Sequence, residues 1–165
     1  MKIAICSDSH DNLVNIKKFL SWCNRHRVKT ILHCGDWCAP SVLEFYRKNF
    51  KGEIFGVYGN VHADDETVQK FAKKFKVKIK EDELKVDIDG IKMLLTHYPD
   101  KAKKLAEKGG YDLIFYGHSH VPWMKKVKNT YIANPGTLAG MFQKASFGVY
   151  DTTKRTLDLK ILELC

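Results

Sequence analysis

Short apolar segments alternate with amphipathic ones in the first third of the chain, and this alternation is the strongest constraint on its fold. The apolar segments are residues 2–7, 28–34 and 53–58, and each stops at a turn that contains Asp or Asn. Residues 12–26 carry apolar side chains at helical spacing, and Pro40 is suited to the first turn of a helix that runs to about Asn49. A strand-helix-strand order predicts right-handed crossovers and a largely parallel sheet.

The pattern changes after residue 60, where hairpins replace crossovers. Two alternating segments, 84–88 and 91–96, face each other across Asp89-Gly90, a dipeptide typical of a tight turn between antiparallel strands. The other expected elements are helices over 64–75 and 101–108, a buried strand over 113–116, and short strands over 124–164 with turns at 128–129 and 152–154. We therefore expect a mostly antiparallel second half within an α/β (α+β) fold.

The length and charge of the chain narrow the class of protein. A chain of 165 residues is long enough to bury a core and predicts a single domain over residues 1–165. The net charge of +9 and the pI near 9.3 imply attraction to anions, such as nucleic acid or a phosphate-bearing small molecule. Much of this charge is lysine spread along helical faces, which is the usual composition of a solvated surface. No apolar run approaches the roughly 20 residues that span a bilayer.

The cysteines predict a protein of a reducing compartment. There are five, an odd number at irregular spacing, so they do not form a disulfide framework. The chain opens without an apolar signal segment, and we therefore expect a cytoplasmic location and no membrane association. Cys34 and Cys38 lack a second Cys/His pair at the spacing of a zinc site, so we interpret both as packing residues.

Five predicted strands end at polar side chains of types that bind metals. These clusters are Asp8-Ser9-His10, Gly35-Asp36, Gly59-Asn60, Thr96-His97 and Gly117-His118-Ser119-His120. Ligands of open α/β sheets bind outside the carboxyl ends of the strands, so the five clusters can meet in space. Each alone has a structural alternative, since Asp36 could cap a helix and Asn60 could occupy a left-handed turn. Their accumulation at strand ends favours a shared metal site.

The set of two carboxylates, one amide and four imidazoles suits Mn, Fe, Co, Ni or Zn better than Ca or Mg. It is sufficient for two divalent ions if one carboxylate bridges them. A pair of ions about 3.5 to 4 Å apart lowers the pKa of a shared water, holds a phosphoryl group and neutralises charge during in-line displacement. The predicted chemistry is therefore phosphoester hydrolysis.

The order D-x-H, G-D, G-N, T-H and G-H-S-H resembles the calcineurin-like metallophosphoesterases. The short length, the start MKIAICSDSH and the segment Asn134-Pro135-Gly136 are similar to their small single-domain phosphodiesterase branch. This resemblance implies a four-layer αββα sandwich of two mixed β-sheets flanked by helices. It also implies two metal sites that share Asp36. The first would contain Asp8, His10, Asp36 and His120, and the second Asp36, Asn60, His97 and His118.

The third motif departs from the family pattern. Many members read G-N-H-[DE], where the His is thought to protonate the leaving group, but here Val61 follows Asn60 and cannot donate a proton. His62, one residue further on, is the candidate proton donor, and an exposed loop histidine is the alternative. We count Asn60 as a catalytic residue as well as a ligand. We expect activity to fall steeply as the leaving group becomes more basic.

The leading hypothesis is a dinuclear-metal phosphodiesterase that hydrolyses a small phosphodiester, such as a cyclic-nucleotide-like substrate, by attack of a metal-bound hydroxide. The alternative is a retromer-subunit-like protein-interaction scaffold with a residual metal site, because the expected fold also resembles that of a retromer subunit, which departs from the catalytic pattern at metal positions. A nuclease is a third interpretation, in which Trp22, Trp37 and Trp123 stack on bases, but the chain has no room for an extra nucleic-acid-binding segment. Nucleic acid is therefore not the expected partner.

Apolar residues in the last third of the chain leave the oligomeric state open. Met141, Phe142 and Phe147 could form a homodimer contact. Burial in the core is the expected use of all three, since large apolar side chains are usually buried.

Overall fold

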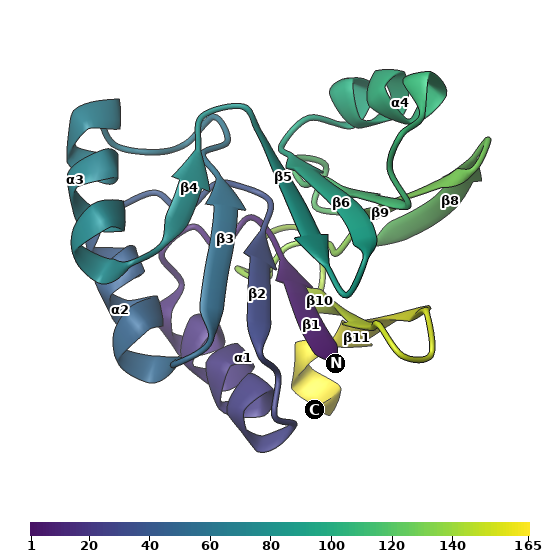
Figure 1. Ribbon diagram of the computed structural model, residues 1–165. Helices are drawn as coiled ribbons and strands as arrows, with labels where there is room; N and C mark the ends of the chain where they lie inside the picture. Colours follow the sequence, from purple (N-terminus) through teal and green to yellow (C-terminus); the bar gives the residue numbers. More distant parts are fainter.

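The computed structural model describes residues 1–165 as two facing β-sheets with helices on both outer sides (Figure 1). The helices are α1 (Leu13–Arg25), α2 (Ser41–Asn49), α3 (Asp65–Phe75) and α4 (Pro99–Lys108), and a 3₁₀ turn, η1 (Leu162–Leu164), ends the chain. The strands are β1 (Lys2–Cys6), β2 (Thr30–His33), β3 (Glu53–Val57), β4 (Lys78–Lys80), β5 (Glu83–Ile88), β6 (Ile91–Thr96), β7 (Leu113–Phe115), β8 (Trp123–Val127), β9 (Thr130–Asn134), β10 (Ser146–Asp151) and β11 (Thr156–Ile161). The expected αββα sandwich of two mixed sheets is confirmed.

The first sheet has the order β11-β10-β1-β2-β3-β4. Its strands β1 to β4 pair in parallel, as the alternation of strands and helices predicts. The end of the chain returns to this sheet, where β10 pairs antiparallel with β1. Strand β4 was not expected, because its sequence KIK has a single apolar side chain, which the edge position tolerates. The result places β1 in the middle of the sheet.

The second sheet has the order β5-β6-β7-β9-β8. The hairpin of β5 and β6 is confirmed, and both Asp89 and Gly90 adopt the positive φ angles that its turn requires. The expectation of a mostly antiparallel second half is wrong for the centre of this sheet, because β7 pairs in parallel with both β6 and β9. Helix α4 supplies the crossover from β6 to β7, and it begins at Pro99, two residues earlier than expected.

Side chains of alternate residues along the central strands fill different layers of the sandwich. Ile3 and Ile5 of β1 belong to the apolar layer between the sheets, and Ala4 and Cys6 face α1, α2 and α3. Leu94 of β6 packs in a third layer under α4. Burying one such Ile or Leu stabilises the fold by about 1.5 to 3 kcal/mol. None of the helices has the length and apolar character needed to cross a membrane.

Two expectations about apolar residues need correction. Phe147 is fully buried as expected, but Met141 is 42% exposed and Phe142 is 89% exposed, because they lie in the loop before β10 rather than on a strand. Trp22 and Trp37 are buried in the core, which leaves only Trp123 of the three tryptophans available to a base. The basis for a nuclease interpretation is thereby weakened.

Candidate metal centre

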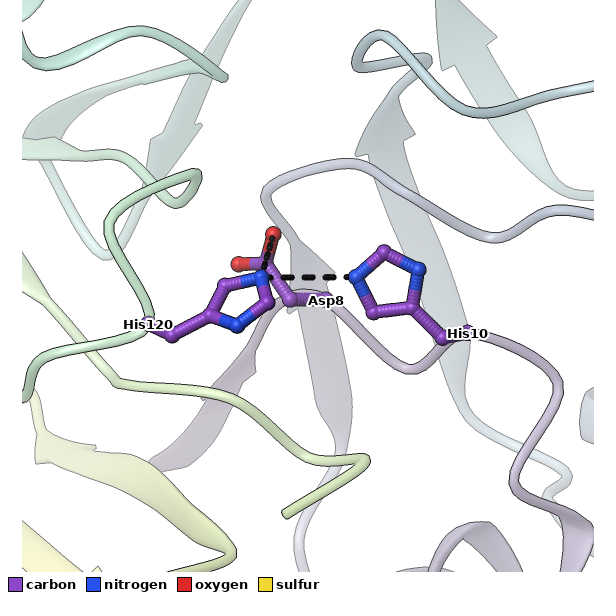
Figure 2. A group of neighbouring side chains, drawn as sticks. All are labelled: Asp8, His10 and His120. Carbon is purple, nitrogen blue, oxygen red and sulfur yellow. Dashed lines mark hydrogen bonds and ion pairs between the residues drawn. The ribbon is translucent and has the colours of Figure 1, made fainter. Parts of the chain in front are cut away.

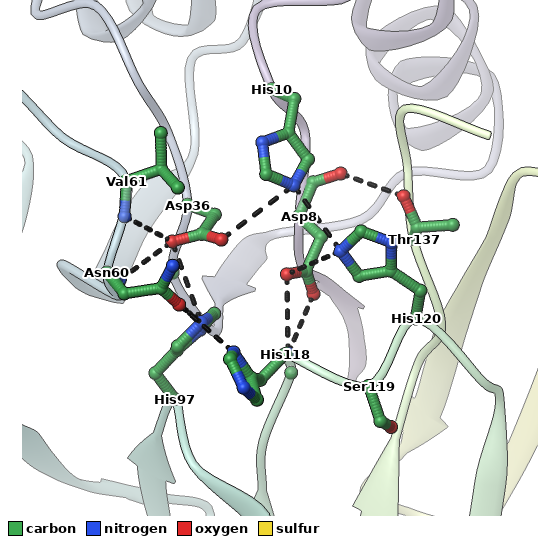
Figure 3. Close-up of polar contacts among 12 residues, drawn as sticks. Asp8, His10, Asp36, Asn60, Val61, His97, His118, Ser119, His120 and Thr137 are labelled. Carbon is green, nitrogen blue, oxygen red and sulfur yellow. Dashed lines mark hydrogen bonds and ion pairs between the residues drawn. The ribbon is translucent and has the colours of Figure 1, made fainter. Parts of the chain in front are cut away.

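All seven predicted ligand residues lie at the carboxyl ends of five strands and meet between the two sheets (Figure 3). The turns after β1, β2 and β3 carry Asp8, His10, Asp36 and Asn60, and those after β6 and β7 carry His97, His118 and His120. The parallel pairing of β1, β2 and β3 brings their ends to one edge, which is the reason that residues far apart in sequence converge.

Asp8, His10 and His120 form the first group of converging side chains (Figure 2). The His120 Nε2 atom lies 3.3 Å from the Asp8 Oδ1 atom and 3.4 Å from His10 Nε2. The His10 Nε2 atom is also 3.7 Å from the Asp36 Oδ2 atom. Two imidazole nitrogens and two carboxylate oxygens thus point to one volume, as the ligands of a cation do.

The second group consists of Asp36, His97, Asn60 and His118. The Asn60 Oδ1 atom lies 2.9 Å from His97 Nε2 and 3.0 Å from His118 Nδ1, and His97 Nε2 is 3.5 Å from Asp36 Oδ1. His118 therefore contacts this group while His120 contacts the first, as their predicted separate roles require (Figure 3). Asp36 contributes one carboxylate oxygen to each group.

The Asp36 carboxylate is held in place by backbone donors. The N–H groups of Asn60 and Val61 both donate to its Oδ1 atom, at 2.8 Å each. A Cβ atom at Gly59 would collide with this carboxylate, so the close approach of the two turns requires glycine, which also adopts a φ of +95°. The orientation of Asp36 is thus determined by the neighbouring turn.

The carboxylates of Asp8 and Asp36 are buried and form no ion pair with a Lys or Arg side chain. Asp8 is 0% exposed and Asp36 is 2% exposed, and their ion pairs are all with histidines. Burial raises the pKa of the Asp8 carboxyl above its ordinary value. An unpaired buried carboxylate is costly, and converging carboxylate and imidazole groups compensate one another when a divalent cation lies between them. The donor set therefore fits a metal centre.

Five of the ligand residues have a left-handed backbone conformation. Asp8, His10, Asp36, His118 and His120 have φ angles between 38° and 69°. Such angles are uncommon outside glycine and cost of order 1 to 3 kcal/mol each, although Asp, Asn and His adopt them more readily than other residues. Strained backbone of this kind is concentrated at functional sites.

Two groups outside the predicted set orient the second-sheet ligands. The Cys34 carbonyl lies 2.8 Å from His97 Nδ1, so it accepts the proton of that nitrogen and leaves Nε2 free to face the second group. Asn134, part of the Asn-Pro-Gly segment, donates to the Gly117 carbonyl and the Ser119 hydroxyl at 2.9 Å each. These bonds fix the turn that carries His118 and His120.

His33 is a further residue that the sequence did not point to. Its Nδ1 atom accepts from the Gly35 N–H at 3.2 Å, so its Nε2 carries the proton and donates to the Ser9 hydroxyl at 3.1 Å. The Ser9 hydroxyl is 3.4 Å from the Asp36 carbonyl, to which it donates. Burial lowers the pKa of the His33 imidazole well below its ordinary value, which keeps it neutral. His33 thus links the turns after β1 and β2.

The structure corrects the interpretation of Cys38. Cys34 is buried in the layer between the sheets, as expected of a packing residue. Cys38 is partly exposed, and its Sγ atom lies 3.5 Å from His10 Nδ1, on the side of the ring that faces away from the metal centre. Burial raises the pKa of its thiol to about 11, so it stays protonated at neutral pH.

His62 makes its contacts outside the metal centre. Its Nε2 atom lies 2.9 Å from the Asp65 carboxylate, and its ring packs beside Tyr58. The side chain of Val61 is 41% exposed next to Asn60. In this conformation neither the Val61 side chain nor the His62 side chain offers a general acid next to Asp36 or Asn60.

A four-layer αββα sandwich whose two sheets share a cluster of carboxylates and imidazoles defines the class of metal-dependent phosphoesterases. The sequence model of the calcineurin-like phosphoesterase superfamily domain matches residues 1–155. The chain therefore belongs to the calcineurin-like phosphoesterase superfamily.

Known relatives agree with this assignment. The phosphodiesterase MJ0936 of Methanocaldococcus jannaschii is 32% identical over 167 residues, which cover 99% of this chain and 100% of the relative. The solved structure of an archaeal phosphodiesterase matches with a TM-score of 0.89 and 31% identity, over 98% of this chain and 99% of that one. Zinc-complexed Vps29 from Entamoeba histolytica matches with a TM-score of 0.71 and 18% identity, over 96% and 90%. At that identity the likeness to Vps29 shows the fold alone.

Proposed function

We propose that this chain is a dinuclear-metal phosphodiesterase that hydrolyses small phosphodiesters. The first ion would be held by Asp8, His10, Asp36 and His120, and the second by Asp36, Asn60, His97 and His118. The observation that carries this proposal is the position of the Asp36 carboxylate, whose Oδ2 atom lies 3.7 Å from His10 Nε2 and whose Oδ1 atom lies 3.5 Å from His97 Nε2. Because both sheets contribute ligands, we further propose that residues 1–165 act as one domain.

Bound divalent ions would activate a water, hold the phosphoryl oxygens and neutralise the charge that develops on them. The residues of this chain orient that chemistry. The backbone N–H groups of Asn60 and Val61 fix the Asp36 carboxylate between the two groups. The N–H of His118 donates to the Asp8 carboxylate at 3.1 Å, and this bond joins the ligand turns of the two sheets.

The surroundings of the centre favour a diester over a monoester. No Lys or Arg is among the side chains that hydrogen-bond, ion-pair or stack with the seven ligand residues, whose neighbours of this kind are Ser9, Cys38, Tyr98, Thr137 and Phe142. A monoester dianion gains from such cations, and a diester carries one negative charge and needs them less. A diester also has a second ester group, which can contact these neighbouring side chains.

Leaving-group protonation is the step for which this chain has the fewest candidates. Val61 cannot donate a proton, and His62 would have to leave Asp65 to do so. We retain His62 as the candidate donor and propose that substrates with acidic leaving groups, which need little protonation, react fastest.

The experiment that tests the function is a panel of phosphomonoesters and phosphodiesters, assayed with metal-depleted protein and added Mn, Fe, Co, Ni or Zn. We expect metal-dependent hydrolysis of diesters with a nitrophenol leaving group, and loss of that activity in Asp36→Ala and His118→Ala. Full activity in either variant would overturn the proposal. Substoichiometric metal after reconstitution, together with no turnover, would favour the scaffold interpretation instead.

A further inference from the structure

Phe142 is an exposed aromatic residue beside the metal centre. It is 89% exposed, and its ring lies nearly parallel to the His120 imidazole, with centroids 6.4 Å apart and an angle of 24° between the planes. Its φ angle is 61°, a conformation in which a bulky aromatic residue is an outlier. The chain thus maintains both an unfavourable backbone and an unfavourable exposure at this position. A ligand that covers the ring would remove this apolar surface from water.

The base of the Phe142 loop is attached to the metal-binding turns. The side-chain amide of Asn12 donates to the Ala139 carbonyl at 2.9 Å, and that of Asn15 donates to the Leu138 carbonyl at 3.1 Å. The Ala139 N–H in turn donates to the Asp8 carbonyl at 3.0 Å. Because the loop is anchored to the residue that carries the first carboxylate, Phe142 has a defined position relative to the centre.

A second aromatic residue borders the other group of ligands. The Tyr98 ring packs edge-on against His97 and His118, with centroid distances of 5.1 and 5.3 Å, and the residue is 41% exposed. Phe142 thus contacts a histidine of the first group, and Tyr98 contacts two histidines of the second. The exposed side chain of Val61 adds an apolar surface next to Asn60. Exposed aromatic side chains therefore border both groups of ligands.

We propose that Phe142 is a specificity-determining residue, and that the substrate is a phosphodiester with a planar aromatic group, an aryl ring or a nucleobase, that stacks on it. This inference rests on the proposed phosphodiesterase function and adds the class of the ester group. A phosphate held between the two ligand groups has one ester substituent on the side of His120, within reach of the Phe142 ring. Tyr98 forms the corresponding wall on the side of His118.

The test compares three diesters with the same p-nitrophenol leaving group and a different second group, namely methyl, phenyl or thymidine. We expect Phe142→Ala to lower the ratio of kcat/KM for the phenyl ester over the methyl ester about tenfold, mainly through KM, as loss of one stacking contact does. Phe142→Trp should restore the ratio. Leu164→Ala removes another exposed apolar side chain, 81% exposed and not in contact with the seven ligand residues, and serves as the control.

The thymidine ester distinguishes the two kinds of ring. If Phe142→Ala lowers kcat/KM about tenfold for both the phenyl and the thymidine ester, relative to the methyl ester, the residue stacks on aryl rings and nucleobases alike, and the proposal is supported. A loss confined to the thymidine ester identifies a nucleobase as the group that stacks. An equal loss for all three esters would indicate a structural role and overturn the proposal. So would an unchanged ratio accompanied by a change in oligomeric state on size-exclusion chromatography, which would make Phe142 a subunit contact.

A binding measurement separates this inference from the proposed function. Calorimetric titration of metal-loaded protein with diphenyl phosphate and with dimethyl phosphate needs no turnover. Wild-type protein should bind the diphenyl compound more tightly, and Phe142→Ala should reduce that preference about tenfold. If no ester is hydrolysed but this preference is present, the phosphodiesterase proposal fails and the stacking site stands. If hydrolysis occurs without the preference, the stacking site fails.

Discussion

The ligand turns of the first sheet are joined to one another by several backbone hydrogen bonds, whereas those of the second sheet are joined by one, from the Gly117 N–H to the His97 carbonyl at 3.0 Å. The Asp8 N–H donates to the Gly35 carbonyl at 3.0 Å, and the Asp36 N–H donates to the Tyr58 carbonyl at 2.7 Å. These backbone bonds join the turns after β1, β2 and β3 without help from any side chain. The first-sheet half, which supplies both carboxylates, is therefore preformed by the fold.

The second-sheet half supplies imidazoles, and side chains take part in the bonds that join its ligand turns to the first sheet. The turn of His118 reaches the first sheet through the Asp8 carboxylate, and His97 reaches it through the Cys34 carbonyl. Exposure does not follow this division, since each half has buried ligands, Asp8 and Asp36 in one and His97 in the other, and each has one exposed ligand, Asn60 or His118. The comparison teaches that the first sheet holds both carboxylates on turns joined by several backbone bonds, and that the second sheet completes the centre with three imidazoles.

Asp36→Asn breaks the link between the two halves and should have the largest effect. The amide keeps the Oδ1 atom that accepts the Asn60 and Val61 N–H groups, so the turn is retained while the charge is lost. We expect kcat/KM to fall roughly 10³-fold, about 4 kcal/mol, as the charge between the two ligand groups disappears.

Activity assays with metal analysis by mass spectrometry check this effect. Asp82→Asn, which removes an exposed carboxylate paired with Lys101, is the matched control and should behave like wild type. Retention of two metal equivalents and of activity within tenfold in Asp36→Asn would contradict the bridging role.

Metal binding should stabilise the protein in a pH-dependent way, because it fixes the second sheet to the first. The pKa of Asp8 is raised by burial in the folded state, so the metal-free folded protein holds this proton more tightly than the unfolded chain, whose Asp pKa is about 3.9. Its unfolding free energy therefore falls as pH rises above that value. Metal binding requires the ionised carboxylate and strengthens over the same range.

The metal-loaded and metal-free stability curves should thus separate as pH rises. At a metal concentration of 100 times Kd the stabilisation is about 2.7 kcal/mol, which corresponds to a rise in Tm of roughly 5 to 10 °C near neutral pH and less near pH 4. Calorimetry at several pH values, with and without a chelator, measures it. A constant difference across this range would argue against Asp8 as a ligand.

Val61→His introduces an imidazole at the position of the first-sheet half where many family members have a histidine and this chain has none. An imidazole beside Asn60 could protonate a basic leaving group, a contribution of about 10²-fold in well-positioned cases. We expect a gain of roughly tenfold for an alkyl leaving group and little change for nitrophenol, and so a flatter dependence of rate on leaving-group pKa.

His62→Gln in the wild-type background is the companion measurement. If His62 turns into the site, this variant should steepen the dependence on leaving-group pKa. An identical slope would remove His62 as the proton donor. If the rate of the wild-type protein does not depend on the pKa of the leaving group, the expectation that the site protonates leaving groups only weakly is contradicted.

His33→Gln should have the smallest effect and tests how far the first-sheet half is preformed. His33 links Ser9 to the turn of Asp36 without facing the metal centre. Loss of this link should weaken metal binding about tenfold, the lower end of the range for groups that orient ligands. His26→Gln is a matched control, because His26 stacks on Trp22 much as His33 stacks on Trp37. Equal metal affinities in both variants would contradict the positioning role.

The sequence predicted the parallel strands β1 to β3 and led us to expect their ends to meet, because both follow from local rules. Buried strands that alternate with helices leave one parallel arrangement, and polar residues after such strands gather at one edge. The parallel pairing of β7 could not be predicted, because which strands become neighbours depends on packing across the whole sheet. The edge strand β4 carries too few apolar residues to be recognised.

Residues that act through a partner far away in the sequence were also beyond prediction. In the sequence His33 belongs to an apolar strand, and only the structure shows its contact with Ser9. Cys38 was likewise interpreted as a packing residue, and only the structure shows its contact with His10. Phe142 was expected in the core, because its hydrophobicity predicts burial and the loop that exposes it has no local signature. Strand-end chemistry can thus be predicted from sequence, while the groups that surround it require the tertiary structure.

The left-handed turns at the ligands have a consequence for the choice of knock-out. Alanine at His118 or Asp36 would remove a ligand and also impose a side chain that disfavours positive φ, so two effects would be combined. Glycine accepts the conformation and would leave a vacated ligand position with the backbone intact. Imidazole added to a His118→Gly protein could then occupy that position from solution. The strained backbone thereby makes this centre suited to chemical complementation, in which a free small molecule replaces a missing side chain.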